Sequence, residues 1–145
     1  MDTPKLTVEL VPATAWGANL RSILHPSHWD RLRRASYRRA GYRCEICQGK
    51  GPKHPVECHE IWHYNDEDKR QTLQGLISLC PPCHRVKHLG HAHVIGKGDE
   101  AREHLRQVNG WSQSETARYI GTVFQRWEER SQFEWALDLS WLETS

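Results

Sequence analysis

Two short stretches decide the fold: residues 44–47 read CEIC, and residues 76–88 read LISLCPPCHRVKH. Each contains a C-x-x-C pair, and 32 residues lie between Cys47 and Cys80. Zinc prefers four ligands in a tetrahedron, and thiolates on two tight turns supply them without strain. A redox pair or unrelated buried cysteines would be the alternative, but two such pairs in one chain favour a metal. We therefore predict a closed, structural zinc site formed by Cys44, Cys47, Cys80 and Cys83.

The composition explains why the chain would need a metal. Of its 145 residues, 37% are hydrophobic and 26% are charged, which is typical of a globular protein. Residues 41–98 are rich in Gly, Pro, His and Cys, and so short a segment rarely buries enough apolar surface to fold alone. We predict an α+β fold in three parts. These are an N-terminal strand and basic helix at 1–40, a zinc-stapled core at 41–98 and a helical extension at 99–145.

The first residues, MDTPKLTVEL, carry an acid and no long apolar run, which does not fit a signal peptide. The sequence also contains no apolar stretch of the length that crosses a bilayer. We therefore expect a cytoplasmic protein without a membrane partner, in which thiols bind metal instead of pairing. The fifth cysteine, Cys58, belongs to neither pair and is interpreted as a small buried residue.

Charge is distributed unevenly along the chain. The net charge is only +2, but residues 1–98 carry 15 Lys and Arg against 9 Asp and Glu, and residues 99–145 carry 5 against 9. Clusters of arginine suit phosphate backbones, and the alternative is a solvated helix face. The candidate DNA-binding residues precede the first cysteine pair: Arg31, Arg33, Arg34, Arg38 and Arg39.

Periodicity and turn signals predict the elements before and within the core. We expect a strand over 6–11 and a helix over 26–40 that ends at a glycine. In the core we expect a strand over 56–61, an irregular loop over 65–74, and a helix over 84–89 that the next glycine breaks.

Helical signals dominate the rest of the chain. A loop is predicted over 91–98 and a helix over 99–108. Residues 112–115 read SQSE, a capping box that should begin a helix ending near Arg130. Residues 133–143 alternate in part and are predicted to form a final strand or an amphipathic helix.

The sequence around the second cysteine pair resembles a known family. Residues 56–61 read VECHEI, residues 75–84 read GLISLCPPCH, and His88 follows. These motifs resemble the HNH nucleases (ββα-metal or His-Me finger nucleases) of the type stapled by four cysteines. The resemblance covers roughly residues 41–90, and the pattern L-I-x-L-C-x-x-C-H-x-x-x-H is quite specific. It implies a small ββα-metal core in a zinc-bound, treble-clef-like frame with flanking helices.

The resemblance also implies a catalytic metal. In this family a β-hairpin and a helix hold one divalent metal, commonly magnesium, against the scissile phosphate, and a histidine on the first strand activates water. By position, His59, His84 and His88 would be the metal ligands. His84 and His88 are four residues apart, so both would lie on one helical face, which suits chelation. The alternative is that the three are ordinary surface or capping histidines.

Two positions depart from the family pattern. The residue after the first ligand, normally the histidine base, is Glu60, and the position of the asparagine that orients this base is Gly75. A carboxylate accepts a proton from water only if its pKa is suitably raised, and beside a cation it is held ionised or becomes a ligand. Glu60 is therefore the candidate catalytic base. His63 is the alternative if the chain turns it towards the metal.

A second motif overlaps these residues. Residues 59–63 read HEIWH, which satisfies the H-E-x-x-H signature of zinc peptidases. That motif needs a helix to bring both histidines to one face, and a third ligand farther along the chain. Here it follows a predicted strand and lies between two zinc knuckles, so a zinc peptidase is a remote alternative.

The predicted function is metal-dependent hydrolysis of phosphodiester bonds in DNA. The expected cofactors are a structural Zn²⁺ and a catalytic Mg²⁺ or other divalent cation. The expected partner is nucleic acid, and double-stranded DNA is the form that we favour. Glu60 or His63 would activate water, and the arginine helix would hold the backbone without reading bases. The alternative is a catalytically inactive zinc module that binds nucleic acid or a protein, which the changes at Glu60 and Gly75 favour.

Overall fold

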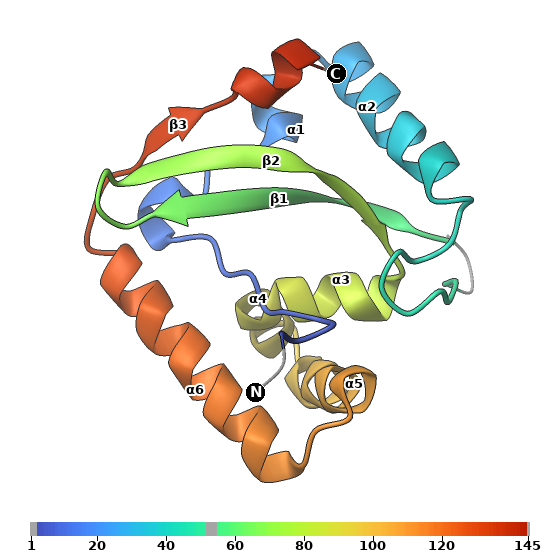
Figure 1. Ribbon diagram of the computed structural model, residues 1–145, viewed down its shortest axis with the longest axis vertical. Coiled ribbons are helices and arrows are strands. Elements are labelled where there is room, and N and C mark those ends of the chain that lie inside the picture. Colours follow the sequence, from blue (N-terminus) through green and yellow to red (C-terminus); the bar gives the residue numbers. More distant parts are fainter. Residues whose placement is uncertain (1–2, 52–54, 145) are drawn as a thin grey trace.

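A computed structural model describes residues 3–51 and 55–144, and its elements are arranged around a central β-hairpin (Figure 1). The hairpin consists of β1 (Glu57–Asn65) and β2 (Arg70–Leu79), which pair antiparallel. A short strand, β3 (Ala136–Asp138), joins β2 in parallel. The sheet order is β1-β2-β3, so β1 is an edge strand. The α+β class predicted from the sequence is confirmed.

One face of the hairpin is covered by the N-terminal helices and by the C-terminal end of the chain (Figure 1). The helices are α1 (Leu20–Ile23) and α2 (Pro26–Arg39), which follow the 3₁₀ helix η1 (Ala13–Ala15). The C-terminal part is a 3₁₀ helix, η2 (Ser140–Thr144). The buried residues of this smaller apolar cluster are Leu20, Trp29, Leu73 and Leu76.

The other face carries the main core (Figure 1). Three helices follow β2 directly, namely α3 (Pro81–Lys87), α4 (Leu89–Val94) and α5 (Gly98–Asn109). The long helix α6 (Gln113–Arg130) then runs back towards the hairpin turn. The core draws on the whole described chain, from Leu6 near its start to Ile120 on α6. Among the described residues, no helix is both long and apolar enough to cross a bilayer.

The predicted loop over 65–74 is wrong, because most of it belongs to β2. The turn itself is short: the side-chain oxygen of Asn65 accepts hydrogen bonds from the backbone N–H groups of Glu67 and Asp68, at 3.0 Å each. Beyond it, a glutamine occupies an inward position of the strand. Gln71 is only 1% exposed, and its amide donates to the Tyr64 hydroxyl at 3.4 Å. A buried polar residue hides the alternation that identifies a strand.

The predicted strand over 6–11 is also wrong, because the segment is extended but pairs with no strand among the described residues. It crosses α3 and α6, and its backbone N–H groups find other acceptors. Those of Leu6 and Val8 donate to the Asn109 side chain and the Tyr119 hydroxyl, at 3.0 and 2.9 Å. That of Glu9 donates to the carbonyl of Lys87 at 3.1 Å. The segment is therefore fixed across the core as a strap.

Between the core and α5 the chain is more helical than predicted. The predicted helix over 84–89 begins earlier, at Pro81, and ends at Lys87. The first half of the predicted loop over 91–98 belongs to α4. The glycine expected to break the helix, Gly90, lies inside α4. The reason is tertiary, because Leu89 and Ala92 are both about 99–100% buried in the core and hold this short helix in place.

The remaining helices agree with the sequence. α2, α5 and α6 match the predicted ranges within a few residues. At the start of α6, the hydroxyl of Ser112 and the carboxylate of Glu115 each accept a hydrogen bond from the other residue's backbone N–H, as a capping box requires. Residues 133–143 contain both a short strand and the start of η2.

Candidate metal centres

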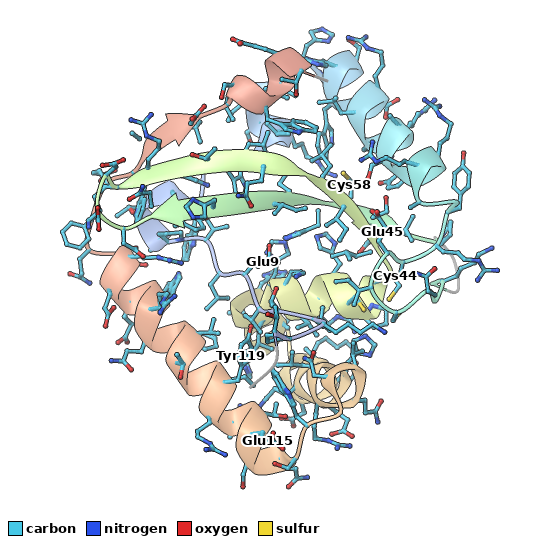
Figure 2. The ribbon with its side chains drawn as sticks, in the orientation of Figure 1. Glu9, Cys44, Glu45, Cys58, Glu115 and Tyr119 are labelled. Atoms are coloured by element: carbon cyan, nitrogen blue, oxygen red, sulfur yellow. The ribbon has the colours of Figure 1, made fainter. Side chains whose placement is uncertain are left out.

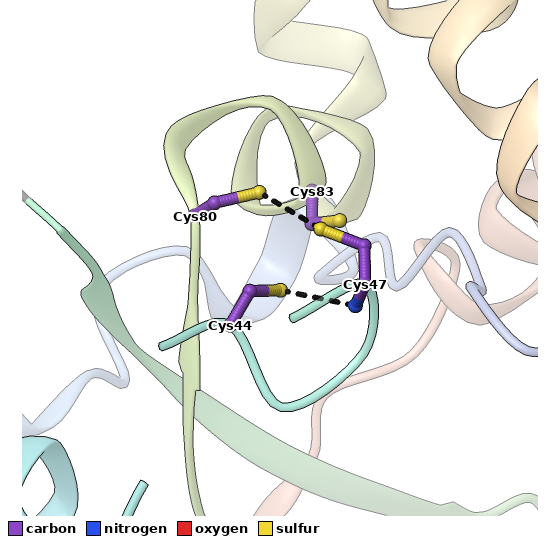
Figure 3. A group of neighbouring side chains, drawn as sticks. All are labelled: Cys44, Cys47, Cys80 and Cys83. Carbon is purple, nitrogen blue, oxygen red and sulfur yellow. Dashed lines mark hydrogen bonds between the residues drawn. The ribbon is translucent and has the colours of Figure 1, made fainter. Parts of the chain in front are cut away.

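The four cysteines of the two C-x-x-C pairs lie together where β2 meets α3 (Figure 3). Their sulfur atoms all lie within 4.8 Å of one another, and those of Cys47 and Cys80 are 3.6 Å apart. A zinc ion with Zn–S bonds of 2.3 Å in a tetrahedron requires sulfur atoms about 3.8 Å apart. The spacing fits, and the cluster could hold a metal such as zinc.

Local backbone geometry aims these thiols inward. In the first turn, the backbone N–H of Cys47 donates to the sulfur of Cys44 at 3.5 Å, and that of Gly49 to the sulfur of Cys47 at 3.4 Å. Gln48 between them has a positive φ of 65°, which tightens the turn. On the other side, Cys80 precedes α3 and Cys83 lies in its first turn, where the helix dipole favours thiolates.

The charges of the four thiols are interdependent. A hydrogen bond from Cys83 lowers the pKa of Cys44 to about 4, because its effect on the pKa is larger than the opposing effect of burial. The same bond and burial raise the pKa of Cys83, and burial raises that of Cys80 to about 12. One thiolate therefore forms easily, and a cation would be needed for the others to ionise. His104 of α5 adds a ring nitrogen 3.1 Å from the sulfur of Cys83.

A second group of ligands lies beside the first. His59 of β1, His84 of α3 and His88 just after α3 place one nitrogen each within 4.8 Å of the others. The ring centroids are 5.3 Å apart from His59 to either partner and 5.0 Å apart between His84 and His88. The structure thus brings together all three histidines singled out in the sequence. Imidazole ligands suit a transition metal, so the group could hold such an ion.

Two carboxylates hold these rings. Oε1 of Glu57 lies 3.1 Å from Nδ1 of His84, and Oε1 of Glu9 lies 3.0 Å from Nε2 of His59. Glu9 also pairs with Lys87, whose side chain is only 5% exposed. Figure 2 shows Glu9 on the N-terminal strap, between the hairpin and α3. Neither carboxylate was identified from the sequence. Contacts of this kind orient metal-ligating histidines and increase their basicity.

The protonation states of His84 and His88 suit metal binding. Burial is the main cause that lowers the pKa of His84 and of His88, the latter to about 3, and the nearby His59 lowers both further. A neutral imidazole is the form that binds a metal. Burial would raise the pKa of Glu9, but its hydrogen bond with His59 and the charge of Lys87 together lower it to about 2.

Glu60 and His63, the two candidate bases, lie on opposite faces of β1. Because side chains alternate along a strand, His63 shares the face of His59, and Glu60 points to the face that α1 covers. There the Glu60 carboxylate accepts a hydrogen bond from the backbone N–H of Leu20 at 3.1 Å. Burial raises the pKa of Glu60 against the effect of this bond.

The position expected to hold an asparagine is packed against the C-terminal segment. A Cβ atom at Gly75 would lie 3.7 Å from the indole of Trp141, so an asparagine side chain would meet that ring. The H-E-x-x-H motif lies on β1, and its two histidines are not placed by the helix that peptidase geometry requires.

A cavity of about 820 Å³ runs along β1 and brings the candidate groups to one space. It is bordered by the three histidines, by Glu60 and by His63. None of the five arginines of α2 is among the described residues that border it. Two of them, Arg33 and Arg34, pair with Asp30 on their own helix. The structure therefore does not bring the arginine cluster to the histidines.

Comparisons with known proteins identify no relative. A scan against protein-family models gave no match. Searches of curated protein sequences and of solved structures gave none either.

Proposed function

We propose that the protein is a metal-dependent endonuclease of the HNH type, which hydrolyses phosphodiester bonds in DNA. One observation carries this proposal: histidines from a β-hairpin and from the helical segment after it lie close together, and α3 carries both His84 and Cys83 of the four-cysteine cluster. The order β1, β2, α3 is the order of the ββα arrangement that the sequence motifs suggest. The proposal therefore depends on motif and geometry together.

The ligand set favours one group of metals. Three imidazoles suit Zn²⁺, Ni²⁺, Fe²⁺ or Cu²⁺, whereas Mg²⁺ prefers oxygen ligands. We therefore expect a divalent transition metal at His59, His84 and His88 in preference to magnesium. When bound, such a metal would polarise the phosphate and stabilise charge on the leaving oxygen.

The protein's own residues would supply orientation and proton transfer. Glu57 and Glu9 hold the rings of His84 and His59, so that their nitrogens stay turned towards one point. Glu60 borders the same cavity and would accept a proton from the attacking water, for which its raised pKa is favourable. His63, which is exposed and borders the cavity as well, is the alternative base.

A non-catalytic zinc module that binds nucleic acid or a protein is the second candidate. The position of Glu60 favours it, because this side chain lies on the opposite face of β1 from His59 and its carboxylate already accepts a hydrogen bond from the Leu20 N–H. Gly75 favours it as well, because the position offers no side chain to orient a base.

Plasmid nicking separates the two candidates. Wild-type protein and His88→Ala would be incubated with supercoiled plasmid and Mn²⁺, Zn²⁺, Ni²⁺ or Mg²⁺ in turn. The nuclease proposal expects nicking by the wild type with at least one added metal, none without added metal, and none by His88→Ala. Plasmid binding without nicking under every metal would favour the binding module.

A further inference from the structure

The arginines that border the cavity come from parts of the chain outside the arginine cluster of α2. They are Arg21 on α1, and Arg126 and Arg130 on α6. Helix α6 belongs to the C-terminal region, which carries more acids than bases overall. Two of the three arginines at this cavity, Arg126 and Arg130, therefore come from a segment that is acidic overall.

Two of the three arginines that border this cavity form no ion pair among the described residues. Arg130 forms a two-pronged ion pair with Asp66, at 2.9 and 3.0 Å. Arg21 and Arg126 are exposed, and neither has an ion pair within 4.0 Å among the described residues. The acids that border the cavity are engaged: Glu9 with His59 and Lys87, and Glu60 with the Leu20 N–H. An anionic ligand would meet two available cations.

A buried donor in the cavity wall also needs an acceptor. The side chain of Trp29 borders the cavity and is only 8% exposed. Its indole N–H has no hydrogen-bond partner among the described residues. A buried donor without a partner costs about 1–3 kcal/mol, and this nitrogen has almost no accessible surface, so a ligand in the cavity would reach it only if the Trp29 ring moved.

The cavity is elongated along the edge strand. Its lining runs from Cys58 to Tyr64 on β1, roughly 20 Å at 3.3 Å per residue. This is roughly the axial rise of six nucleotides of one strand. A volume of about 820 Å³ lies within the range of pockets that enclose small ligands, and a duplex is far larger than such a ligand. The dimensions suit one strand better than two.

We propose that this cavity, the β1 groove, binds a single-stranded segment of nucleic acid, whose phosphates are held by Arg21 and Arg126. The inference deepens the proposed nuclease function and rests on it for the role of the histidines. A single strand offers phosphate oxygens to the two arginines. Aromatic residues in the lining, such as Tyr64 and Trp127, provide surfaces of the kind on which bases stack.

Binding measurements test the inference without any cleavage. Fluorescein-labelled oligothymidylate, its duplex with oligoadenylate, and poly-glutamate would be titrated by anisotropy with no divalent metal added. We expect the single strand to bind more tightly than the duplex. The double variant Arg21→Gln/Arg126→Gln should weaken single-strand binding by about tenfold. Each arginine that contacts a phosphate contributes about 0.7 to the slope of log K against log salt, so the slope should flatten by about 1.4.

Matched variants control for general loss of charge. Arg118→Gln/Arg102→Gln removes two arginines of α6 and α5 that do not border the groove, and it should bind like the wild type. Thermal melting would check that all variants fold. Undiminished binding by the groove variant, equal binding of the duplex or of poly-glutamate, or the same loss in the control would overturn the inference.

The outcomes for the groove and for the nuclease can be told apart. If the protein binds the single strand through the groove but nicks no plasmid, the proposal of the β1 groove stands and the proposal of a nuclease fails. If Arg21→Gln/Arg126→Gln nicks plasmid normally and binds the single strand as the wild type does, the proposal of a nuclease stands and the proposal of the β1 groove fails.

Discussion

Oε1 of Glu9 lies 3.0 Å from Nε2 of His59, although the two residues are 50 positions apart in the sequence. The contact joins the N-terminal strap to the histidine group of the hairpin. Because Glu9 also pairs with the buried Lys87, one carboxylate connects the strap, β1 and α3. The strap therefore belongs to the candidate metal centre, even though it lies outside the 41–90 segment that carries the family resemblance.

Replacing Glu9 tests this connection. Glu9→Gln keeps the size of the side chain but removes its charge, so His59 loses a partner that orients it. We expect affinity for Mn²⁺ or Zn²⁺ at the histidines to fall by about 10–100-fold, as measured by calorimetric titration. The melting temperature should fall as well, since Lys87 is left buried without its ion pair. Glu128→Gln, an exposed change on α6, is the control, and equal affinities for the two variants would contradict the prediction.

The cysteine cluster is expected to be necessary for folding. Cys44→Ser removes one of four clustered thiols, and structural zinc sites contribute about 10 kcal/mol or more to folding. Purified Cys44→Ser should therefore contain less than one zinc per chain and lose its cooperative melting transition. Cys58→Ser is the matched control, because Cys58 lies outside the cluster (Figure 2). A Cys44→Ser protein that melts like Cys58→Ser would show that the cluster holds no structural metal.

The ion pair between Asp66 and Arg130 should make stability depend on pH. Hydrogen bonds from Arg130 lower the pKa of Asp66 below its ordinary 3.8. The stabilisation is therefore complete above pH 3.8 and is lost as the pH falls through the lowered pKa. At pH 7, Asp66→Asn should cost about 0.5–1 kcal/mol, because pairs at the surface are weak. Urea unfolding of wild type and Asp66→Asn at pH 7 would check this cost, because a pH as low as 2.5 would also protonate the cysteine ligands; equal free energies of unfolding would contradict the prediction.

Glu60 is the candidate base that would take a proton from the attacking water. Glu60→Gln keeps the hydrogen bond from Leu20 but cannot take a proton, so the rate of plasmid nicking should fall by about 10²–10⁴-fold. His63→Gln on the other face of β1 is the informative companion variant. A large loss in His63→Gln with little change in Glu60→Gln would assign the base to His63.

Most of the candidate metal ligands could be found from the sequence because zinc and imidazole chemistry depend on residue type and close spacing, and His59 was found from the family resemblance. Cys44 with Cys47, and His84 with His88, are each within one turn of chain, so no knowledge of the fold is needed to pair them. Their partner carboxylate Glu9 could not be found, because only the fold brings a distant strap to His59. A lone glutamate carries no signal of its own.

The fold was predictable where local signals agree with packing, and not where packing overrides them. Helix α6 begins at its capping box as predicted. The second strand was missed because the polar Gln71 fills a buried position, and α4 was missed because Leu89 and Ala92 stabilise it through the core. The groove arginines were missed as well, since Arg126 faces β1 only once α6 has folded back.

The central claim is that the chain has two separate metal sites, one made of cysteines and one of histidines. Metal content per chain tests it most directly, by mass spectrometry of wild type and His88→Ala after equilibration with Zn²⁺ and removal of excess metal. The account predicts two zinc ions in the wild type and one in His88→Ala, with the same melting temperature for the cysteine-stapled core. One zinc ion in both proteins would contradict it.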